Sequence, residues 1–137
     1  EHVSLNDLSD DVTYNKCVSA FDPSSIDRAL PQISRELFER YEIFKSREML
    51  LEWCPKNVHK ATGLAALASI LGLKADQVMA CGDEANDLSM IQWAGLGVAM
   101  GNAIPVVKEV AALVAPVTND QDAVAWAIEN YVLKESE

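Results

Sequence analysis

The pattern of apolar and polar positions changes near residue 55 and divides the chain into two stretches of different character. In the first, partly alternating apolar runs predict strands at 14–21, 41–45 and 49–53. Between them, apolar residues recur at helical spacing, with Asp22 or Ser24 as the expected cap of a first helix. Pro31 fits the first turn of a second helix at 31–40. Together these elements predict a small α+β unit.

From residue 58 onward, short apolar runs alternate with helical patterns. An Ala- and Leu-rich stretch predicts a helix that begins near Lys60 and is closed by Gly72. Further along, strands are expected at 78–81, 97–100 and 113–117, and helices at 86–94, 104–112 and 121–133. Alternating strands and helices are typical of an α/β fold with a parallel sheet. We therefore expect one domain over 1–54 and a second, α/β domain over 55–137.

Composition narrows the classes of function. Half of the 137 residues are hydrophobic and 23% are charged, which is typical of a globular protein. The net charge of −10 argues against a nucleic-acid binder, which needs a basic face. Three widely spaced cysteines predict free thiols in a reducing compartment. Since the apolar runs are too short to span a membrane and no signal peptide opens the chain, we expect a cytoplasmic protein without a membrane partner.

The stretch Cys81–Asp87, C-G-D-E-A-N-D, carries the densest group of candidate ligands. It follows the apolar run at 78–81 and precedes an amphipathic segment, so it lies at a strand end where a helix begins. Three carboxylates within five residues suit a hard divalent cation such as Mg2+. An acidic helix start, in which Asp and Asn only cap the helix, explains the same residues. Taken alone, the stretch leaves both interpretations open.

Lys60 is the second candidate residue, because a lysine at a helix start opposes the helix dipole. A residue that breaks a local rule is a candidate functional residue, although a solvated surface lysine is the simpler interpretation. Beside Asp83, Asn86 and Asp87, Lys60 would complete a pocket of mixed charge, in which the lysine holds an anion and the aspartates hold a metal. Positioning and charge neutralisation of this kind are the requirements of phosphoryl transfer.

Three segments together resemble a known family. K-A-T-G-L at Lys60, M-A-C-G-D-E-A-N-D-L-S-M about twenty residues later, and G-V-A-M-G-N-A after that resemble the haloacid dehalogenase (HAD) superfamily, especially its Cof-type sugar phosphatases. The resemblance covers residues 58–137 closely, and 14–53 resemble the end of the family's α/β cap. It implies a Rossmann-like HAD core, present as its C-terminal half, preceded by the C-terminal part of an α+β cap.

The resemblance also implies a role for each candidate residue. Lys60 matches the catalytic lysine that contacts the phosphoryl group and the nucleophilic carboxylate. Asp83 matches a Mg2+ ligand, and Asp87 matches the acid that supports the metal shell, often through water. Asn86 matches an asparagine at the phosphate site, and Asn102 lies in the next strand-end loop, where it would line the pocket. The implied activity is Mg2+-dependent hydrolysis of small phosphorylated metabolites, with sugar phosphates as the expected substrates.

The family's nucleophile motif, D-x-D-G-T or D-x-D-G-V, is absent from these 137 residues. Without the aspartate that forms a phospho-aspartate, and without its acid/base neighbour, the chain is expected to be a fragment that is inactive alone. In the family the missing first strand lies beside the strand that ends at Asp83, so we expect an exposed sheet edge that permits self-association. Two alternatives stay open: a phosphomutase of the same superfamily, and a non-catalytic interaction or regulatory module.

Overall fold

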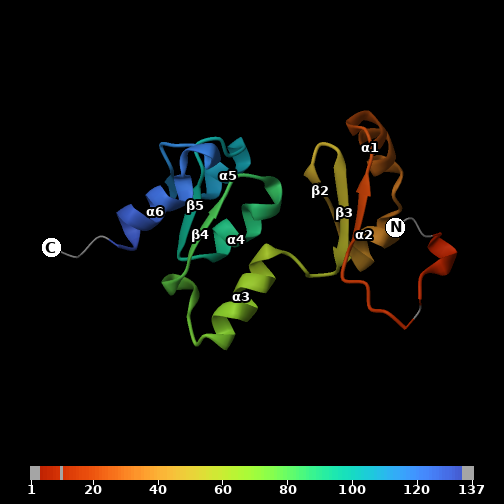
Figure 1. The fold of residues 1–137 in the computed structure, drawn as a ribbon, viewed down its shortest axis with the longest axis horizontal. Coiled ribbons are helices and arrows are strands. Elements are labelled where there is room, and N and C mark those ends of the chain that lie inside the picture. The colour runs from red at the N-terminus through yellow and green to blue at the C-terminus, as the bar shows by residue number, and fades with distance from the viewer. Residues whose placement is uncertain (1–3, 10, 134–137) are drawn as a thin grey trace.

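A computed structural model describes residues 4–9 and 11–133 and contains two sheets, each in its own unit, and the short segment 56–59 joins the two units (Figure 1). The first sheet is antiparallel with strand order β1-β3-β2, and the second is parallel with order β4-β5-β6. This arrangement confirms the expected α/β fold with a parallel sheet. The assignment of domains to residues 1–54 and 55–137 stays a prediction.

Over its described residues, the first unit has two α-helices and three strands: β1 (Cys17–Ala20), α1 (Pro23–Ala29), α2 (Arg35–Arg40), β2 (Tyr41–Arg47) and β3 (Leu50–Pro55). Asp22 caps α1 as expected, since its carboxylate accepts the Ser25 N–H at 3.0 Å and the Ser24 hydroxyl at 2.6 Å. These hydrogen bonds lower the pKa of Asp22 to about 2.

The predicted helix over 31–40 is too long at its start. Pro31 lies in a separate 3₁₀ turn, Leu30–Gln32, and α2 begins only at Arg35. Ile33 and Ser34 between them have extended backbone, because the 3₁₀ turn closes with a hydrogen bond from Ile33 N–H to Leu30 O at 3.3 Å. Pro31 therefore begins a short turn instead of the helix.

The second unit alternates helices and strands: α3 (Lys60–Ile70), β4 (Met79–Gly82), α4 (Leu88–Trp93), β5 (Leu96–Ala99), α5 (Pro105–Val110), β6 (Leu113–Val114) and α6 (Ala123–Tyr131). One face of its sheet packs against α4 and α5 through Ile91 and Val107. The other face packs against α6 through Val98 and Ala127. A layer of helices on each face is the arrangement expected for a parallel sheet.

The end of α3 is fixed by Gly72, as the sequence predicts. Gly72 has a φ of 70°, and its N–H reaches Ser69 O at 3.2 Å, while Leu73 N–H reaches Ala68 O at 2.8 Å. This pair of bonds is a Schellman motif, which satisfies carbonyl groups that the helix end would leave unpaired. At its other end, α3 begins at Lys60, also as predicted.

Two other elements are shorter than expected. The helix predicted over 86–94 begins as an α-helix only at Leu88, because Ala85–Asp87 form a 3₁₀ turn. The strand predicted over 113–117 contains only Leu113–Val114, since Pro116 has no N–H to continue the ladder. Both differences place irregular backbone at strand ends, where loops carry the candidate site residues.

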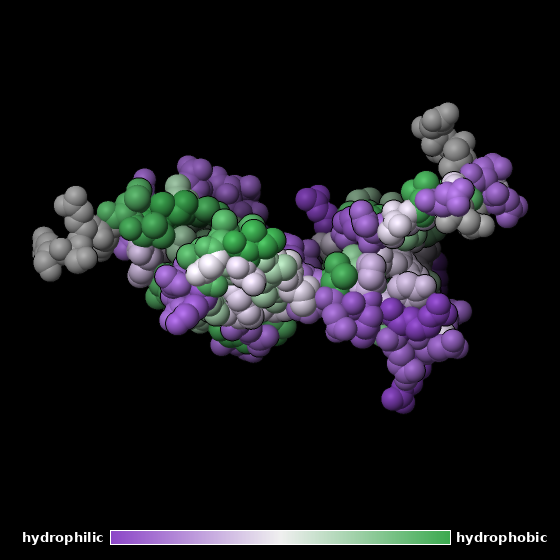
Figure 2. Space-filling view, turned by 90° about the horizontal axis from the view of Figure 1, so that it is seen from below, coloured by the Kyte–Doolittle hydropathy of each residue, from purple (hydrophilic) through white to green (hydrophobic). Residues whose placement is uncertain are grey.

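The second unit exposes apolar surface. Ile70 on α3 is 81% exposed, Leu67 and Leu71 lie exposed beside it, and Ile128 on α6 is also exposed. Figure 2 shows hydrophobic surface gathered over the second unit and mainly hydrophilic surface over the first. Within the described residues, β4 is an edge strand that pairs only with β5. In the same part of the chain, no helix has the length and apolar character needed to cross a bilayer.

Candidate functional site

The loops that follow β4, β5 and β6 meet at the side chain of Asp83. Asn102 Nδ2 donates to Asp83 Oδ2 at 2.9 Å, and Asn119 Nδ2 donates to the same oxygen at 3.2 Å. The backbone N–H of Asn119 in turn donates to Asn102 Oδ1 at 2.8 Å. Because the carboxyl ends of parallel strands lie at one edge of a sheet, the three loops reach one another. The result is a polar cluster centred on one carboxylate.

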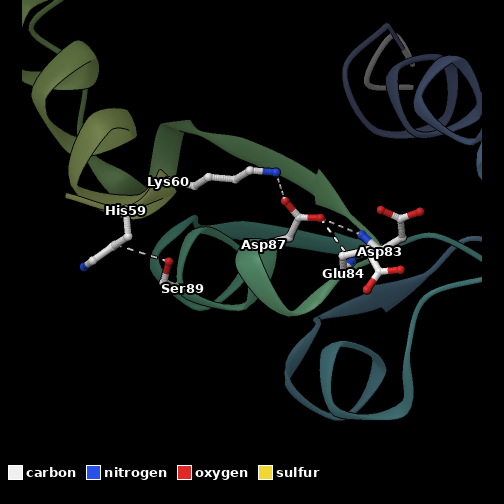
Figure 3. Close-up of polar contacts among 6 residues, drawn as sticks. All are labelled: His59, Lys60, Asp83, Glu84, Asp87 and Ser89. Atoms are coloured by element: carbon white, nitrogen blue, oxygen red, sulfur yellow. Dashed lines mark hydrogen bonds and ion pairs between the residues drawn. The ribbon is translucent and has the colours of Figure 1, made fainter. Parts of the chain in front are cut away.

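Asp87 is the buried anchor of the loop after β4. Asp87 is only 3% exposed. Its Oδ2 accepts hydrogen bonds from the backbone N–H groups of Asp83 at 3.0 Å and Glu84 at 3.1 Å. Its Oδ1 pairs with the ammonium group of Lys60 (Figure 3). Gly82 is required beside it, because a Cβ at position 82 would collide with the Asp87 side chain. Asp87 therefore fixes both the loop and the lysine.

Lys60 extends from the first turn of α3 toward this loop (Figure 3). Its side chain is 47% exposed, so the ammonium group is held by Asp87 and still reaches solvent. An ammonium group has three N–H donors, and the described contacts use only one of them. Lys60 is thus placed to bind an anion at the same edge of the sheet as Asp83.

A cleft of about 500 Å³ lies between the two units, beside Lys60. Phe44 and Glu52 from the first sheet form one wall, and Asn86 and Ser89 lie on the other. Lys16 Nζ donates to Glu52 Oε2 at 2.8 Å across the first wall, and this bond lowers the pKa of Glu52. The cleft therefore combines an aromatic ring with charged and polar groups.

Asn86 and His59 differ in how they face the cleft. The Oδ1 atom of Asn86 is buried and has no hydrogen-bond partner within the described residues, so a donor from a ligand or water would satisfy it. His59 Nδ1 lies 3.3 Å from Ser89 Oγ, and Figure 3 shows the imidazole extending away from Asp87. His59 is therefore engaged with α4 and not with the carboxylates.

The structure brings the predicted site residues together in two linked groups. Lys60 contacts Asp87, Asn102 contacts Asp83, and the two groups join where Asp87 accepts the Asp83 N–H. Their catalytic, phosphate-binding and metal-binding roles stay predictions. Asn119 was not among the predicted site residues, although its position after the third strand of the sheet is the signal that places it in the cluster.

A D-x-D tripeptide does occur at Asp120–Asp122, but it lacks the Gly that follows in the nucleophile motif. It also lies after the last strand, where Asp122 has a φ of 59° directly before α6. This position does not match a nucleophile at the end of a first strand.

The donor groups suit part of a magnesium site. In the ranges 4–9 and 11–133, no group of three or more His, Cys, Asp or Glu side chains is close enough to hold a metal. Mg2+ commonly uses only one or two carboxylates and completes its shell with water and substrate phosphate. Asp83 fits such a role, because its carboxylate is bonded only by neutral amides in the described contacts, whereas the charge of Asp87 is already paired with Lys60.

The fold and this cluster define an α/β protein with a polar site at the carboxyl edge of its parallel sheet. The family of haloacid dehalogenase-like hydrolases matches residues 1–128, and the chain belongs to this family. The resemblance seen in the sequence is thereby confirmed.

Among its curated relatives is YxeH of Bacillus subtilis (strain 168), which is 35% identical over 129 residues, or 94% of this chain and 47% of YxeH. The 5-amino-6-(5-phospho-D-ribitylamino)uracil phosphatase YcsE of the same organism is 46% identical over 92 residues, or 67% of this chain and 36% of YcsE. The chain therefore spans less than half the length of these relatives.

Solved structures of larger proteins also match this chain over part of their length. A haloacid dehalogenase-like hydrolase from Bacteroides thetaiotaomicron superposes with a TM-score of 0.76 at 37% identity, over 92% of this chain and 46% of that one. The sugar phosphatase BT4131 superposes with a TM-score of 0.72 at 26% identity, over 88% of this chain and 44% of that one. The fold is shared in each case across about half of the larger protein.

Proposed function

We propose that this chain forms part of a Mg2+-dependent phosphatase that hydrolyses small phosphorylated metabolites. The observation that carries the proposal is the joint placement of Lys60 and Asp83 at one sheet edge, with Asp87 between them. An anion-binding ammonium and a metal-binding carboxylate at adjacent positions provide the charge neutralisation that phosphoryl transfer needs. Family membership and relatives named as phosphatases support the same activity.

Each residue has a defined task in this proposal. Lys60 binds phosphoryl oxygens while Asp87 holds its ammonium in place. Asp83 would hold Mg2+, with Asp87 supporting the hydration shell, and the ion would neutralise charge on the phosphoryl group. Asn86, which lines the cleft, would contact the phosphate. Asn102 does not line the cleft, and its task would be to orient Asp83.

The nucleophile must come from outside these 137 residues, since the D-x-D-G-T or D-x-D-G-V motif is absent from them. An aspartate nucleophile would form a phospho-aspartate, which water then hydrolyses. We therefore infer that the chain alone is inactive and that the whole protein carries the activity.

The cleft supports a hydroxylated leaving group such as a sugar. Glu52 and Lys16 on one wall offer an acceptor and a donor, and the buried Asn86 Oδ1 needs a hydrogen-bond donor such as a hydroxyl group. Phe44 adds an apolar surface against which a ring packs. The relatives support the same class of substrate, since YcsE is named as the phosphatase of a phosphoribityl compound and BT4131 as a sugar phosphatase.

Assays of the whole protein test this function. Phosphate release from a panel of sugar phosphates and other phosphomonoesters is expected with Mg2+, and loss of activity is expected with EDTA or after Asp83→Ala. The 137-residue chain is expected to release no phosphate. Formation of an isomeric phosphate ester instead of free phosphate would show a mutase, and the absence of either reaction in the whole protein would favour a non-catalytic module.

We also propose that the isolated chain self-associates through the β4 edge and the apolar surface beside it. An unpaired strand edge next to exposed apolar side chains favours pairing with a second copy. Sedimentation velocity is expected to show dimers or larger species, reduced by Ile70→Lys on the 81% exposed side chain and unaffected by Lys74→Ala at an exposed polar site. A wild-type chain that sediments as a monomer throughout would refute this proposal.

The cysteines and the net charge support a location in the cell. Cys17, Cys54 and Cys81 are free thiols, and burial raises the pKa of Cys54 and Cys81, which keeps them protonated. Free thiols together with an acidic surface support a cytoplasmic protein whose partners are small phosphorylated molecules and neither membranes nor nucleic acids.

A further inference from the structure

We propose that Asn119 is a positioning residue for the metal ligand Asp83. This inference rests on the metal site of the proposed function and adds a residue from the third strand-end loop to it. Asn119 and Asn102 both donate to Asp83 Oδ2, at 3.2 Å and 2.9 Å, and no hydrogen bond to Asp83 Oδ1 occurs within the described residues. Two donors on one oxygen orient the carboxylate and leave the other oxygen available to a cation.

Neutral donors matter for the charge of the ligand. A carboxylate turns easily about its last side-chain bond, so a partner is needed to hold it in one orientation. Lysine or arginine would hold it but would also neutralise it, as Lys60 does for Asp87. Amide N–H groups orient Asp83 without cancelling its negative charge, which stays available to attract the cation.

Asn119 is held in place by contacts that do not involve its side chain. Gly101 N–H reaches Val117 O at 2.9 Å, which joins the loop after β5 to the loop after β6. A side chain at Gly101 would prevent this approach, since its Cβ would lie 2.7 Å from Val117 O. The backbone N–H of Asn119 then bonds Asn102 Oδ1 at 2.8 Å, so a substitution of the side chain leaves the loop-to-loop bonds in place.

Helix capping does not account for the Asn119 side chain. The turn Asn119–Gln121 is capped by Thr118, whose N–H donates to Gln121 Oε1 at 3.3 Å and whose carbonyl accepts the Gln121 N–H at 2.9 Å. The Asn119 amide points instead to Asp83, 36 residues away in the sequence. Its contact is therefore directed at the carboxylate and not at its own turn.

Mn2+ binding to the 137-residue chain tests the inference without an activity assay. Paramagnetic broadening of ¹⁵N-labelled amide signals around Asp83 reports the apparent Kd, because Mn2+ takes the same oxygen ligands as Mg2+. Asn119→Ala is expected to raise the Kd by about tenfold, as loss of an orienting partner commonly does, with full broadening regained at higher Mn2+ concentration. Asn119→Ser, a shorter polar replacement, provides a second variant if the alanine variant folds poorly.

The matched control is Asn130→Ala, which removes an asparagine amide that donates to Trp126 O at 2.8 Å on α6, away from the cluster. It is expected to leave the Kd unchanged. If Asn119→Ala and Asn119→Ser both bind Mn2+ like the wild type, the positioning role is wrong while the metal site stands. If the wild-type broadening persists in Asp83→Ala, Asp83 is not the metal ligand, and both the proposed metal site and the positioning role of Asn119 are wrong.

Discussion

Replacing Asp87 with alanine is expected to lower the free energy of unfolding by about 3 kcal/mol, the cost of leaving buried polar partners unpaired. The Asp83 and Glu84 N–H groups would both lose their acceptor, and Lys60 would lose its counter-ion. The amide groups account for the larger share, because the Lys60 side chain is half exposed and water screens its pairing. Urea denaturation followed by circular dichroism measures the change.

Two further variants separate the causes of that loss. Asp87→Asn keeps an oxygen acceptor for the two amides and removes only the charge, so we expect a loss of about half that size. Asp120→Ala removes an exposed carboxylate from the same unit and is expected to change stability by less than about 0.5 kcal/mol. Equal stabilities of Asp87→Ala and Asp120→Ala would show that Asp87 is not the anchor of its loop.

Replacing Lys60 with alanine in the whole protein is expected to reduce the rate of phosphate release by about 10²- to 10³-fold, as removal of one charge-stabilising donor does in other enzymes. The ammonium group is the only cation that the described residues place against Asp87. Its loss would remove the proposed partner of the phosphoryl oxygens. Steady-state kinetics with saturating Mg2+ measures the change in kcat.

The interpretation of that loss depends on folding, because Lys60 also pairs with Asp87. Lys60→Arg keeps the charge but changes its shape, and we expect it to restore only part of the activity. Lys74→Ala, at an exposed lysine beyond the end of α3, is expected to retain full activity. A Lys60→Ala protein that stays folded and releases phosphate at the wild-type rate would exclude Lys60 from the reaction.

The order of elements is predictable from the sequence because it depends on local periodicity. The alternation after residue 58 predicts the parallel sheet, and Gly72 predicts the end of α3 through its need for a positive φ. The first residue of a helix is less predictable where the hydrogen bonds of a 3₁₀ turn compete with those of the α-helix. The 3₁₀ turn at Ala85–Asp87 delays α4, and the turn around Pro31 delays α2.

The candidate site was predictable in its residues and not in its pairings. Spacing alone placed Asp83 and Asp87 in one loop, but it gave no sign that Asp87 turns inward onto the Asp83 and Glu84 amides. The contact of Asn119 with Asp83 was not predictable from the sequence. It depends on the register of β5 and β6 and on the close approach of Gly101 to Val117. Such long-range packing is not encoded in a short motif.

The short segment 56–59, which joins the two units, is hydrogen-bonded at both of its ends. Asn57, with a φ of 62°, donates its N–H to Glu42 on β2 at 3.1 Å, and His59 bonds Ser89 on α4 at 3.3 Å. Lys60 follows directly as the first residue of α3. A rotation of the first sheet against the second must therefore be absorbed next to this lysine. The cleft wall on the first sheet would select the substrate, and the Lys60 ammonium group would bind its phosphate. A movement of that wall would thus also shift the ammonium group.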